Sequence, residues 1–246
     1  MAEQLHLTDA YLRQFDAKVV SAAPHANEQG KLKIILDKTA FYATSGGQPC
    51  DLGKITNKKT NKTSEVVDVR KEAGEVVHTI ICPDASDFAV GDEVLCDIDW
   101  DRRYRLMRTH TAGHALSAVM YEKGILITGN QLGVEETRFD FNMEEFDRAL
   151  IDECISKANS LLAQNKEVKV YFLPREEALA LPGMSKLATA LPPAITILRI
   201  VEIVDMDRQA DGGTHVKNTS EVGKIELARA ENKGKTNRRI YFRLVP

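Results

Sequence analysis

The sequence has few cysteines and no long apolar run. Its four cysteines stand singly and form no C-x-x-C pair, at Cys50, Cys82, Cys96 and Cys154. This pattern excludes a disulfide framework and a cysteine-based zinc knuckle, and we expect buried, reduced thiols. The sequence contains no run of about 18 apolar residues, the length needed to span a bilayer. The opening segment is too polar and acidic for a signal or transit peptide, so we expect a cytoplasmic protein with no membrane partner.

The sequence also lacks a charge of one sign. Lys and Arg number 33 against 36 Asp and Glu, which gives a net charge of −3. The chain as a whole therefore has no positive electrostatic field that would attract a polyanionic partner. Any nucleic-acid contact must be local. The composition, with 43% hydrophobic and 28% charged residues, is that of a globular protein. A length of 246 residues suits two domains of about 100–150 residues each.

The pattern of short runs changes near residue 100. Five runs rich in β-branched residues precede it, at 32–37, 54–59, 63–71, 75–82 and 92–100. They predict a small barrel or a strongly bent sheet. Helical spacing predicts helices over 101–123 and 143–166, the second with an apolar stripe of Phe146, Leu150, Cys154 and Leu161. Further strands are expected at 169–173, 195–204, 222–231 and 237–245. We predict an α+β fold, with a Gly-rich, β-barrel-like domain over 1–97 and an α+β domain over 98–246.

Two histidines lie four residues apart on the first predicted helix. His110 and His114 emerge from one face, one turn apart, within reach of a single ion. Such a pair is either a two-ligand clip for zinc or a pair of helix-face histidines that backbone or solvent satisfies. A metalloprotease of this pattern carries Glu directly after the first histidine. Thr111 stands there instead, so the peptidase interpretation loses its general base.

A third element is the string Asp211-Gly-Gly-Thr-His215. The glycines Gly212 and Gly213 allow a tight turn or an anion-receiving nest of amides, and Asp and His flank them at ligand-like spacing. The alternative is a hairpin turn with an incidental histidine. Three histidines and one carboxylate describe a plausible zinc set, in which Asp211 is either a ligand or a nearby base.

One Gly-rich string and two basic clusters are weaker signals. The string around Gly46 and Gly47 is either a plain hairpin loop or a ligand loop whose Gln48 carboxamide meets a small polar group. The basic clusters either contact phosphates or are solvated faces. The residues we assign to tRNA contact from them are Arg102, Arg103, Lys233, Lys235, Arg238 and Arg239, and Arg105 and Arg108 belong to the first cluster.

Taken in order, five strings resemble a known family. FYATSGGQPCDLG, HTAGH, TGNQLGVEETRFDF, QADGGTHVKNTSEVG and ENKGKTNRR resemble the freestanding alanyl-tRNA editing proteins called AlaX, most closely the medium-length form. The resemblance runs from about residue 5 to the C-terminus and extends to the editing domain of alanyl-tRNA synthetase and, more distantly, to the second additional domain of threonyl-tRNA synthetase. It implies that His110, His114 and His215 bind zinc. Many members have cysteine where this chain has Asp211, so Asp211 is carried over only as the occupant of the fourth position.

The resemblance implies zinc-assisted hydrolysis of the ester that joins a wrong amino acid to the 3′ end of tRNA(Ala). The expected substrate is Ser-tRNA(Ala), with Gly-tRNA(Ala) second, because a pocket built for alanine rejects both weakly. Gln48, Thr111 and Asp211 are the expected catalytic residues. Substrate contacts are expected from Thr44, Gly46, Gly47, Thr128, Gln131, Gly212 and Gly213. The alternatives are a zinc hydrolase for another aminoacyl-tRNA and a non-catalytic RNA-binding module with structural zinc.

Overall fold

The computed structural model describes residues 2–181, 195–234 and 236–246. Its backbone contacts group the chain into two compact units, Met1–Tyr104 and Arg105–Pro246. The predicted division of the chain into domains at residues 97 and 98 stays a prediction. None of the helices formed by the described residues is both long and apolar enough to cross a membrane.

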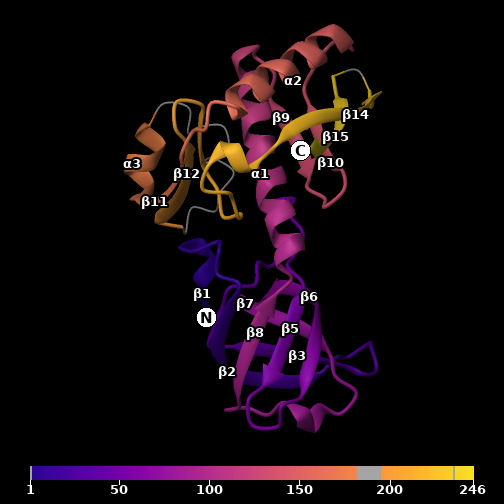
Figure 1. Ribbon diagram of the computed structural model, residues 1–246, viewed down its shortest axis with the longest axis vertical. Coiled ribbons are helices and arrows are strands. Elements are labelled where there is room, and N and C mark those ends of the chain that lie inside the picture. The colour runs from indigo at the N-terminus through magenta and orange to yellow at the C-terminus, as the bar shows by residue number, and fades with distance from the viewer. Residues whose placement is uncertain (1, 182–194, 235) are drawn as a thin grey trace. The chain divides into compact units, whose positions relative to one another are not determined.

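The first unit is built on a closed, six-stranded antiparallel barrel (Figure 1). Around the barrel the strands follow the order β2 (Gln14–Pro24), β3 (Lys31–Leu36), β7 (Glu75–Ile81), β6 (Thr63–Glu72), β5 (Gly53–Asn57) and β8 (Glu93–Ile98). Two short strands, β1 (Glu3–Gln4) and β4 (Lys38–Thr39), pair in parallel beside it. The predicted barrel is confirmed, and β2 is the one barrel strand that the sequence patterns did not mark.

Alternation explains why these strands close into a barrel. Along β2 the residues alternate between exposed and buried, and Phe15, Ala17 and Val19 point inward. The same alternation places Leu32, Ile34 and Leu36 of β3 and Val94, Cys96 and Ile98 of β8 in one apolar core. A sheet with one apolar face buries that face most completely when it closes on itself. All four cysteines of the chain are buried and free.

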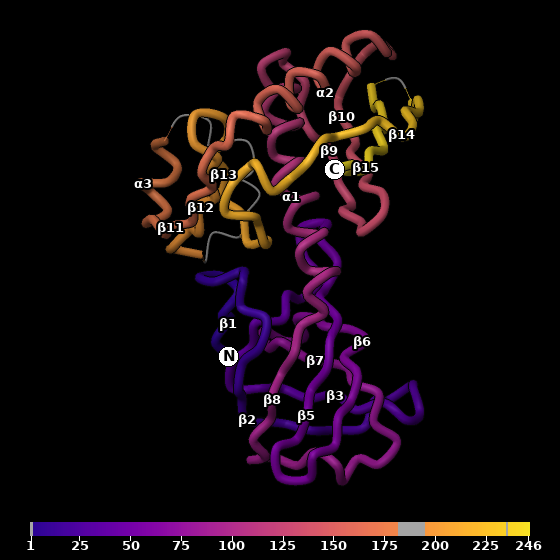
Figure 2. The backbone as a smooth tube through the Cα atoms, viewed as in Figure 1, coloured from indigo at the N-terminus to yellow at the C-terminus, as the bar shows by residue number. Residues whose placement is uncertain are grey.

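The described residues of the second unit form two antiparallel sheets and three α-helices (Figure 2). One sheet has the order β14 (Lys224–Asn232), β15 (Arg238–Val245), β10 (Thr137–Phe141) and β9 (Ile127–Gln131). The other has the order β11 (Val168–Pro174), β12 (Ile197–Ile203) and β13 (Asp207–Ala210). The helices are α1 (Trp100–Glu122), which begins in the first unit, α2 (Arg148–Leu162) and α3 (Arg175–Ala180). The expected α+β fold class is confirmed.

The helix α2 is shorter than predicted. It begins after Asp147, whose carboxylate accepts a hydrogen bond from the Leu150 amide at 2.9 Å and so caps the helix. The buried face runs through Ile151, Cys154, Ile155, Ala158 and Leu162. The predicted apolar stripe was wrong at Phe146, which precedes the helix and is 44% exposed.

The N-terminal part of α1 holds a buried ion pair in the first unit. Arg103 is fully buried, and its Nε donates to Asp51 Oδ1 at 2.8 Å while Nη1 donates to the Ala10 carbonyl at 2.9 Å. Its Nη2 donates to the Ala40 carbonyl at 2.5 Å and to Asp51 Oδ2. The prediction that Arg103 contacts tRNA phosphates is corrected here, because its guanidinium has no exposed surface and its donors are used within the fold.

We expect Arg103→Gln to destabilise the first unit by about 3–5 kcal/mol, because it leaves the Asp51 carboxylate buried without its partner. Trp100 is the only tryptophan and stacks on Tyr104 in the same unit, so its fluorescence during denaturant unfolding measures the loss. The exposed Arg70, which pairs with Asp68, provides the control substitution Arg70→Gln, expected to cost under about 0.5 kcal/mol. An Arg103→Gln protein as stable as the wild type would contradict the assignment.

Candidate metal centre

Helix α1 supplies two histidines to one buried point. His110 and His114 are 5% and 6% exposed, and their ring centroids lie 5.1 Å apart. Between them Gly113 packs on β10, where an added Cβ would lie 2.4 Å from the Phe139 ring. The helix therefore approaches the sheet closely enough to fix the depth of both imidazoles.

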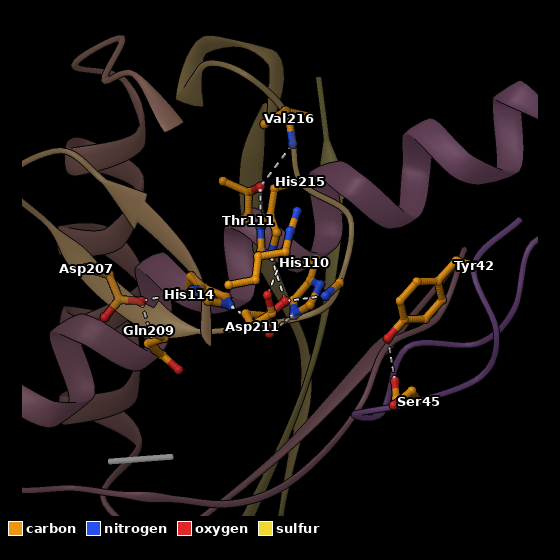
Figure 3. A network of polar contacts seen from close by, with 12 residues as sticks. Tyr42, Ser45, His110, Thr111, His114, Asp207, Gln209, Asp211, His215 and Val216 are labelled. Carbon is orange, nitrogen blue, oxygen red and sulfur yellow. Dashed lines mark hydrogen bonds and ion pairs between the residues drawn. The ribbon is translucent and has the colours of Figure 1, made fainter. Parts of the chain in front are cut away.

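The connection after β13 brings the third histidine. The His215 ring is 3% exposed, and its centroid lies 4.2 Å from that of His110 and 4.7 Å from that of His114. Figure 3 shows the three imidazoles pointing toward one another around the Asp211 carboxylate. The convergence expected from the sequence is present in the structure, since residues more than ninety positions apart in the chain meet at one point.

Asp211 adds a carboxylate to the three imidazoles. Its Oδ2 lies 3.4 Å from His110 Nε2 and 3.7 Å from His114 Nε2, and its Oδ1 lies 3.3 Å from His215 Nε2. One ligand atom from each of the four residues falls within 4.8 Å of every other. Tetrahedral zinc with bonds of about 2.0–2.2 Å places its ligand atoms about 3.3–3.6 Å apart. Three imidazoles and a carboxylate at these distances fit a divalent metal ion such as zinc.

Position 213 must be glycine because the loop after β13 approaches helix α1 closely here. A Cβ at this position would lie 2.2 Å from His110 Cε1 and 2.4 Å from His110 Nδ1. The Gly213 amide donates to Asp211 Oδ1, so the loop also orients the carboxylate. The sequence allowed an anion-receiving nest of amides here, and in the structure the Gly213 amide donates to the Asp211 carboxylate. Gly212 is exposed, and an added Cβ there would meet nothing within 4 Å.

Side chains around the cluster orient two of its imidazoles. His114 Nδ1 hydrogen-bonds to Asp207 Oδ2 at 2.9 Å, and Gln209 Nε2 donates to the same oxygen at 2.8 Å. Thr111 Oγ1 hydrogen-bonds to His215 Nδ1 at 3.1 Å and accepts from the Val216 amide at 3.4 Å (Figure 3). Such outer contacts fix the ring orientation and tautomer of metal-binding histidines.

Thr111 was expected to be catalytic, whereas no sequence pattern marked Asp207 or Gln209. Thr111 is fully buried, and its hydroxyl hydrogen-bonds to the His215 ring. The available signal for Asp207 was weak: a carboxylate four residues before Asp211, in a four-residue strand. In that strand Asp207 and Gln209 share one face because side chains alternate, which is why both can meet.

The carboxylates set the charge of the cluster. Burial acts to lower the pKa of His114, but Asp207 and Asp211 outweigh it and raise that pKa to about 10. Burial acts to raise the pKa of Asp211, yet the His110 charge and hydrogen bonds from the three histidines hold it well below its usual range. Burial and the neighbouring His110 charge keep the pKa of His215 well below its ordinary value. The cluster therefore favours a positive charge, which a bound metal ion supplies in place of a proton.

The residues expected to contact substrate are divided between the two units. Thr128 and Gln131 are exposed on β9, in the same unit as the cluster. Thr44, Gly46, Gly47 and Gln48 belong to the first unit, where Ser45 and Gln48 exchange backbone hydrogen bonds of 3.1 and 2.9 Å around the two glycines.

This segment has the tight-turn geometry that the sequence analysis gave as its simpler interpretation. Gly46 and Gly47 have φ values of 57° and 83°. The Tyr42 hydroxyl donates to the Ser45 carbonyl at 3.0 Å and braces the turn (Figure 3). Thr44 and Gly46 are exposed, whereas Gln48 is fully buried.

Most of the arginines assigned to tRNA contact have partners inside the fold. Arg238 is 4% exposed, and its Nη1 donates to Asn232 Oδ1 at 3.0 Å and to the Asn237 carbonyl at 3.1 Å. Its assignment is corrected because the guanidinium is buried. Arg239 Nε donates to Asp140 Oδ1 at 2.7 Å across β15 and β10. Because Asp140 offsets its charge, Arg239 attracts a phosphate less strongly than an unpaired arginine would.

The other basic residues differ in exposure. Arg102 is half-buried, and its Nε donates to the Cys50 carbonyl at 3.2 Å. Lys233 is exposed and pairs with Glu231 at 2.6 Å. Lys235 lies outside the described residues. Of the assigned set within the described ranges, only Lys233 is classed as exposed.

Two family models match parts of the chain. One describes class II tRNA synthetases (A) and matches residues 7–102, the region of the barrel. The other describes the second additional domain of threonyl and alanyl tRNA synthetases and matches residues 198–241, which include Asp211 and His215.

Curated relatives match over the whole chain. A Saccharolobus solfataricus protein named alanyl-tRNA editing protein AlaX-M is 45% identical over 247 residues, with all of both chains covered. A Methanosarcina mazei protein of the same name is 43% identical over 251 residues, covering 100% of this chain and 97% of the relative. An alanine–tRNA ligase of Saccharolobus islandicus is 36% identical over 236 residues, which are 93% of this chain but 25% of the ligase. The chain therefore belongs to the AlaX-M family of alanyl-tRNA editing proteins.

Proposed function

We propose that the protein edits alanyl-tRNA by hydrolysing the ester of mischarged tRNA(Ala), with Ser-tRNA(Ala) as its main substrate and Gly-tRNA(Ala) as its second. The observation that carries this proposal is the convergence of His110, His114, His215 and Asp211, whose ligand atoms lie within 4.8 Å of one another. The full-length identity with relatives named alanyl-tRNA editing protein supports it. The partner is the acceptor end of the mischarged tRNA, met in the cytoplasm.

The resident cofactor of this proposal is Zn²⁺. The three histidines are the proposed ligands, and Asp211 is either a fourth ligand or a base beside the reacting water. When bound, zinc polarises an ester carbonyl and makes water a better nucleophile near neutral pH. Ester hydrolysis needs both effects, because attack of water on the carbonyl forms a tetrahedral oxyanion, which then collapses as the bond to the ribose oxygen breaks.

The chain's own residues prepare the site for this chemistry. Asp207 holds His114 through Nδ1 and leaves Nε2 directed at the cluster. Thr111 holds His215 in the same way. Asp211, kept ionised by three imidazoles, carries an oxygen that accepts a proton or binds metal. Burial of the histidines excludes bulk water and strengthens each of these electrostatic contacts.

Selectivity against alanine would rest on polar groups that pair with the serine hydroxyl. Such a group stays unpaired when alanine is bound, at a cost of about 1–3 kcal/mol, or roughly 5- to 150-fold in rate. The proposed residues are Thr44, Gln48, Thr128 and Gln131. Thr128 and Gln131 are supported by exposure in the unit of the cluster, while Gln48 would have to be uncovered before it could meet substrate.

We expect the protein to deacylate Ser-tRNA(Ala) and Gly-tRNA(Ala), to spare Ala-tRNA(Ala), and to lose activity with a chelator. His215→Ala should lose more than the 10- to 100-fold typical of outer contacts, since it removes a proposed ligand. His25→Ala, at a histidine that pairs with Glu28 in the other unit, is the matched control and should retain activity. The measurement is release of amino acid from a panel of charged tRNAs.

The same panel separates the alternatives. Deacylation of a different aminoacyl-tRNA alone would identify a hydrolase of another specificity. No deacylation of any substrate, together with unfolding when metal is removed, would identify an RNA-binding module with structural zinc. Chelator-insensitive deacylation of Ser-tRNA(Ala) would contradict the metal-assisted mechanism.

We further expect Asp207→Asn to weaken zinc binding about 10- to 100-fold, because His114 loses the carboxylate that orients its ring and raises its basicity. Competition with a chromophoric chelator measures the affinity directly. Asp205→Asn is the matched control: Asp205 is exposed, two residues away, and its φ of 55° suits asparagine. Equal zinc affinity in Asp207→Asn and wild type would show that Asp207 does not support the metal centre.

A further inference from the structure

A second polar cavity lies in the unit that carries the metal centre. It has a volume of about 320 Å³ and is enclosed by α1, by the connection between β9 and β10, and by the end of β15. Its charged lining consists of Arg105, Arg108, Arg243 and Glu135. Three arginines against one acidic side chain give the lining side chains a net positive charge, on a chain whose net charge is negative.

Arg108 is the unusual member of this lining. It is half-buried, and its Nε and Nη2 donate to the Val222 carbonyl at 3.1 and 2.9 Å. Across the described ranges, no carboxylate forms an ion pair with it. A guanidinium has five N–H donors, so one carbonyl leaves donors unused. A partly buried cation without a counter-ion is costly, and that cost is recovered when an anion enters the cavity.

The two other arginines can join such an anion at little cost. Arg105 Nη1 donates to Glu135 at 2.9 Å, and the side chains are 54% and 85% exposed. Arg243 pairs with Glu226, and both side chains are about half exposed. Exposed ion pairs of this kind contribute about 0–1 kcal/mol, so they exchange readily for a stronger anionic partner.

We propose that this cavity binds a backbone phosphate of the RNA substrate, an inference that rests on the proposed function. The planar fork of arginine matches phosphate oxygens, and three arginines around a polar cavity suit one phosphodiester. A volume of about 320 Å³ holds a phosphate with several waters. Burial of Arg103 and Arg238 strengthens the case, since it removes two arginines expected to serve this purpose.

The position of Arg108 separates the bound phosphate from the esterified 3′ end. Arg108 and His110 lie two residues apart on α1, so their side chains leave the helix about 200° apart. A phosphate held by Arg108 is therefore on the other side of the helix from the metal centre. The bound nucleotide is one that precedes the esterified 3′ end, and the contact anchors the strand while the ester reaches the histidines.

The test is binding of uncharged tRNA(Ala) to the full chain at several salt concentrations. Arg108→Gln should weaken binding about ten-fold. It should also reduce the slope of log K against log salt by about one, because one phosphate contact is lost. Arg243→Gln should weaken binding about three-fold and keeps the test open if Arg108→Gln fails to fold. Arg148→Gln, which removes an equal charge from an exposed pair with Asp152 on α2, is the matched control and should bind as wild type.

Two further arms separate the outcomes. Arg108→Lys keeps the charge and should restore most of the salt slope. Titration with inorganic phosphate tests for a free anion as the ligand: phosphate binding that Arg108→Gln abolishes, with tRNA affinity unchanged, would overturn the RNA assignment. Unchanged tRNA affinity and salt slope in both Arg108→Gln and Arg243→Gln would overturn it as well. Because uncharged tRNA is used, these results are independent of whether the protein deacylates Ser-tRNA(Ala).

Discussion

The metal centre depends on the close contact between helix α1 and the loop that follows β13. That contact is possible because Gly213 has no side chain: an added Cβ would lie 2.2 Å from the His110 ring. With the loop against the helix, His215 lies beside His110 and His114, and Asp211 reaches all three Nε2 atoms. The proposed zinc site and the proposed ester hydrolysis both depend on this close contact.

The surrounding side chains stabilise this contact and determine which charge the cluster favours. Asp207 and Thr111 hold two imidazoles from behind, so the rings keep their direction without a metal ion. Two carboxylates among three buried histidines favour one additional positive charge, as the raised pKa of His114 indicates. Metal binding to such a cluster releases protons and adds its free energy to the stability of the fold.

The sequence predicted the elements whose patterns are regular. Short runs rich in β-branched residues marked five of the six barrel strands, and helical spacing marked α1 with both histidines on one face. It could not separate arginines by burial, because Arg103 at a helix start has the same local pattern whether it faces Asp51 or solvent. It also missed Asp207, since a four-residue strand has too short a period to recognise and its partner His114 is distant in the chain. Contacts of long sequence separation decided each of these cases.

The most direct test of the central claim is X-ray absorption spectroscopy of the zinc-loaded protein. We predict imidazole scattering from three histidines and an oxygen shell at about 2.0–2.2 Å, with no sulfur at about 2.3 Å. In His215→Ala the imidazole contribution should fall by one ligand. A sulfur shell, or imidazole scattering that His215→Ala leaves unchanged, would contradict the convergence of these four residues on one metal ion.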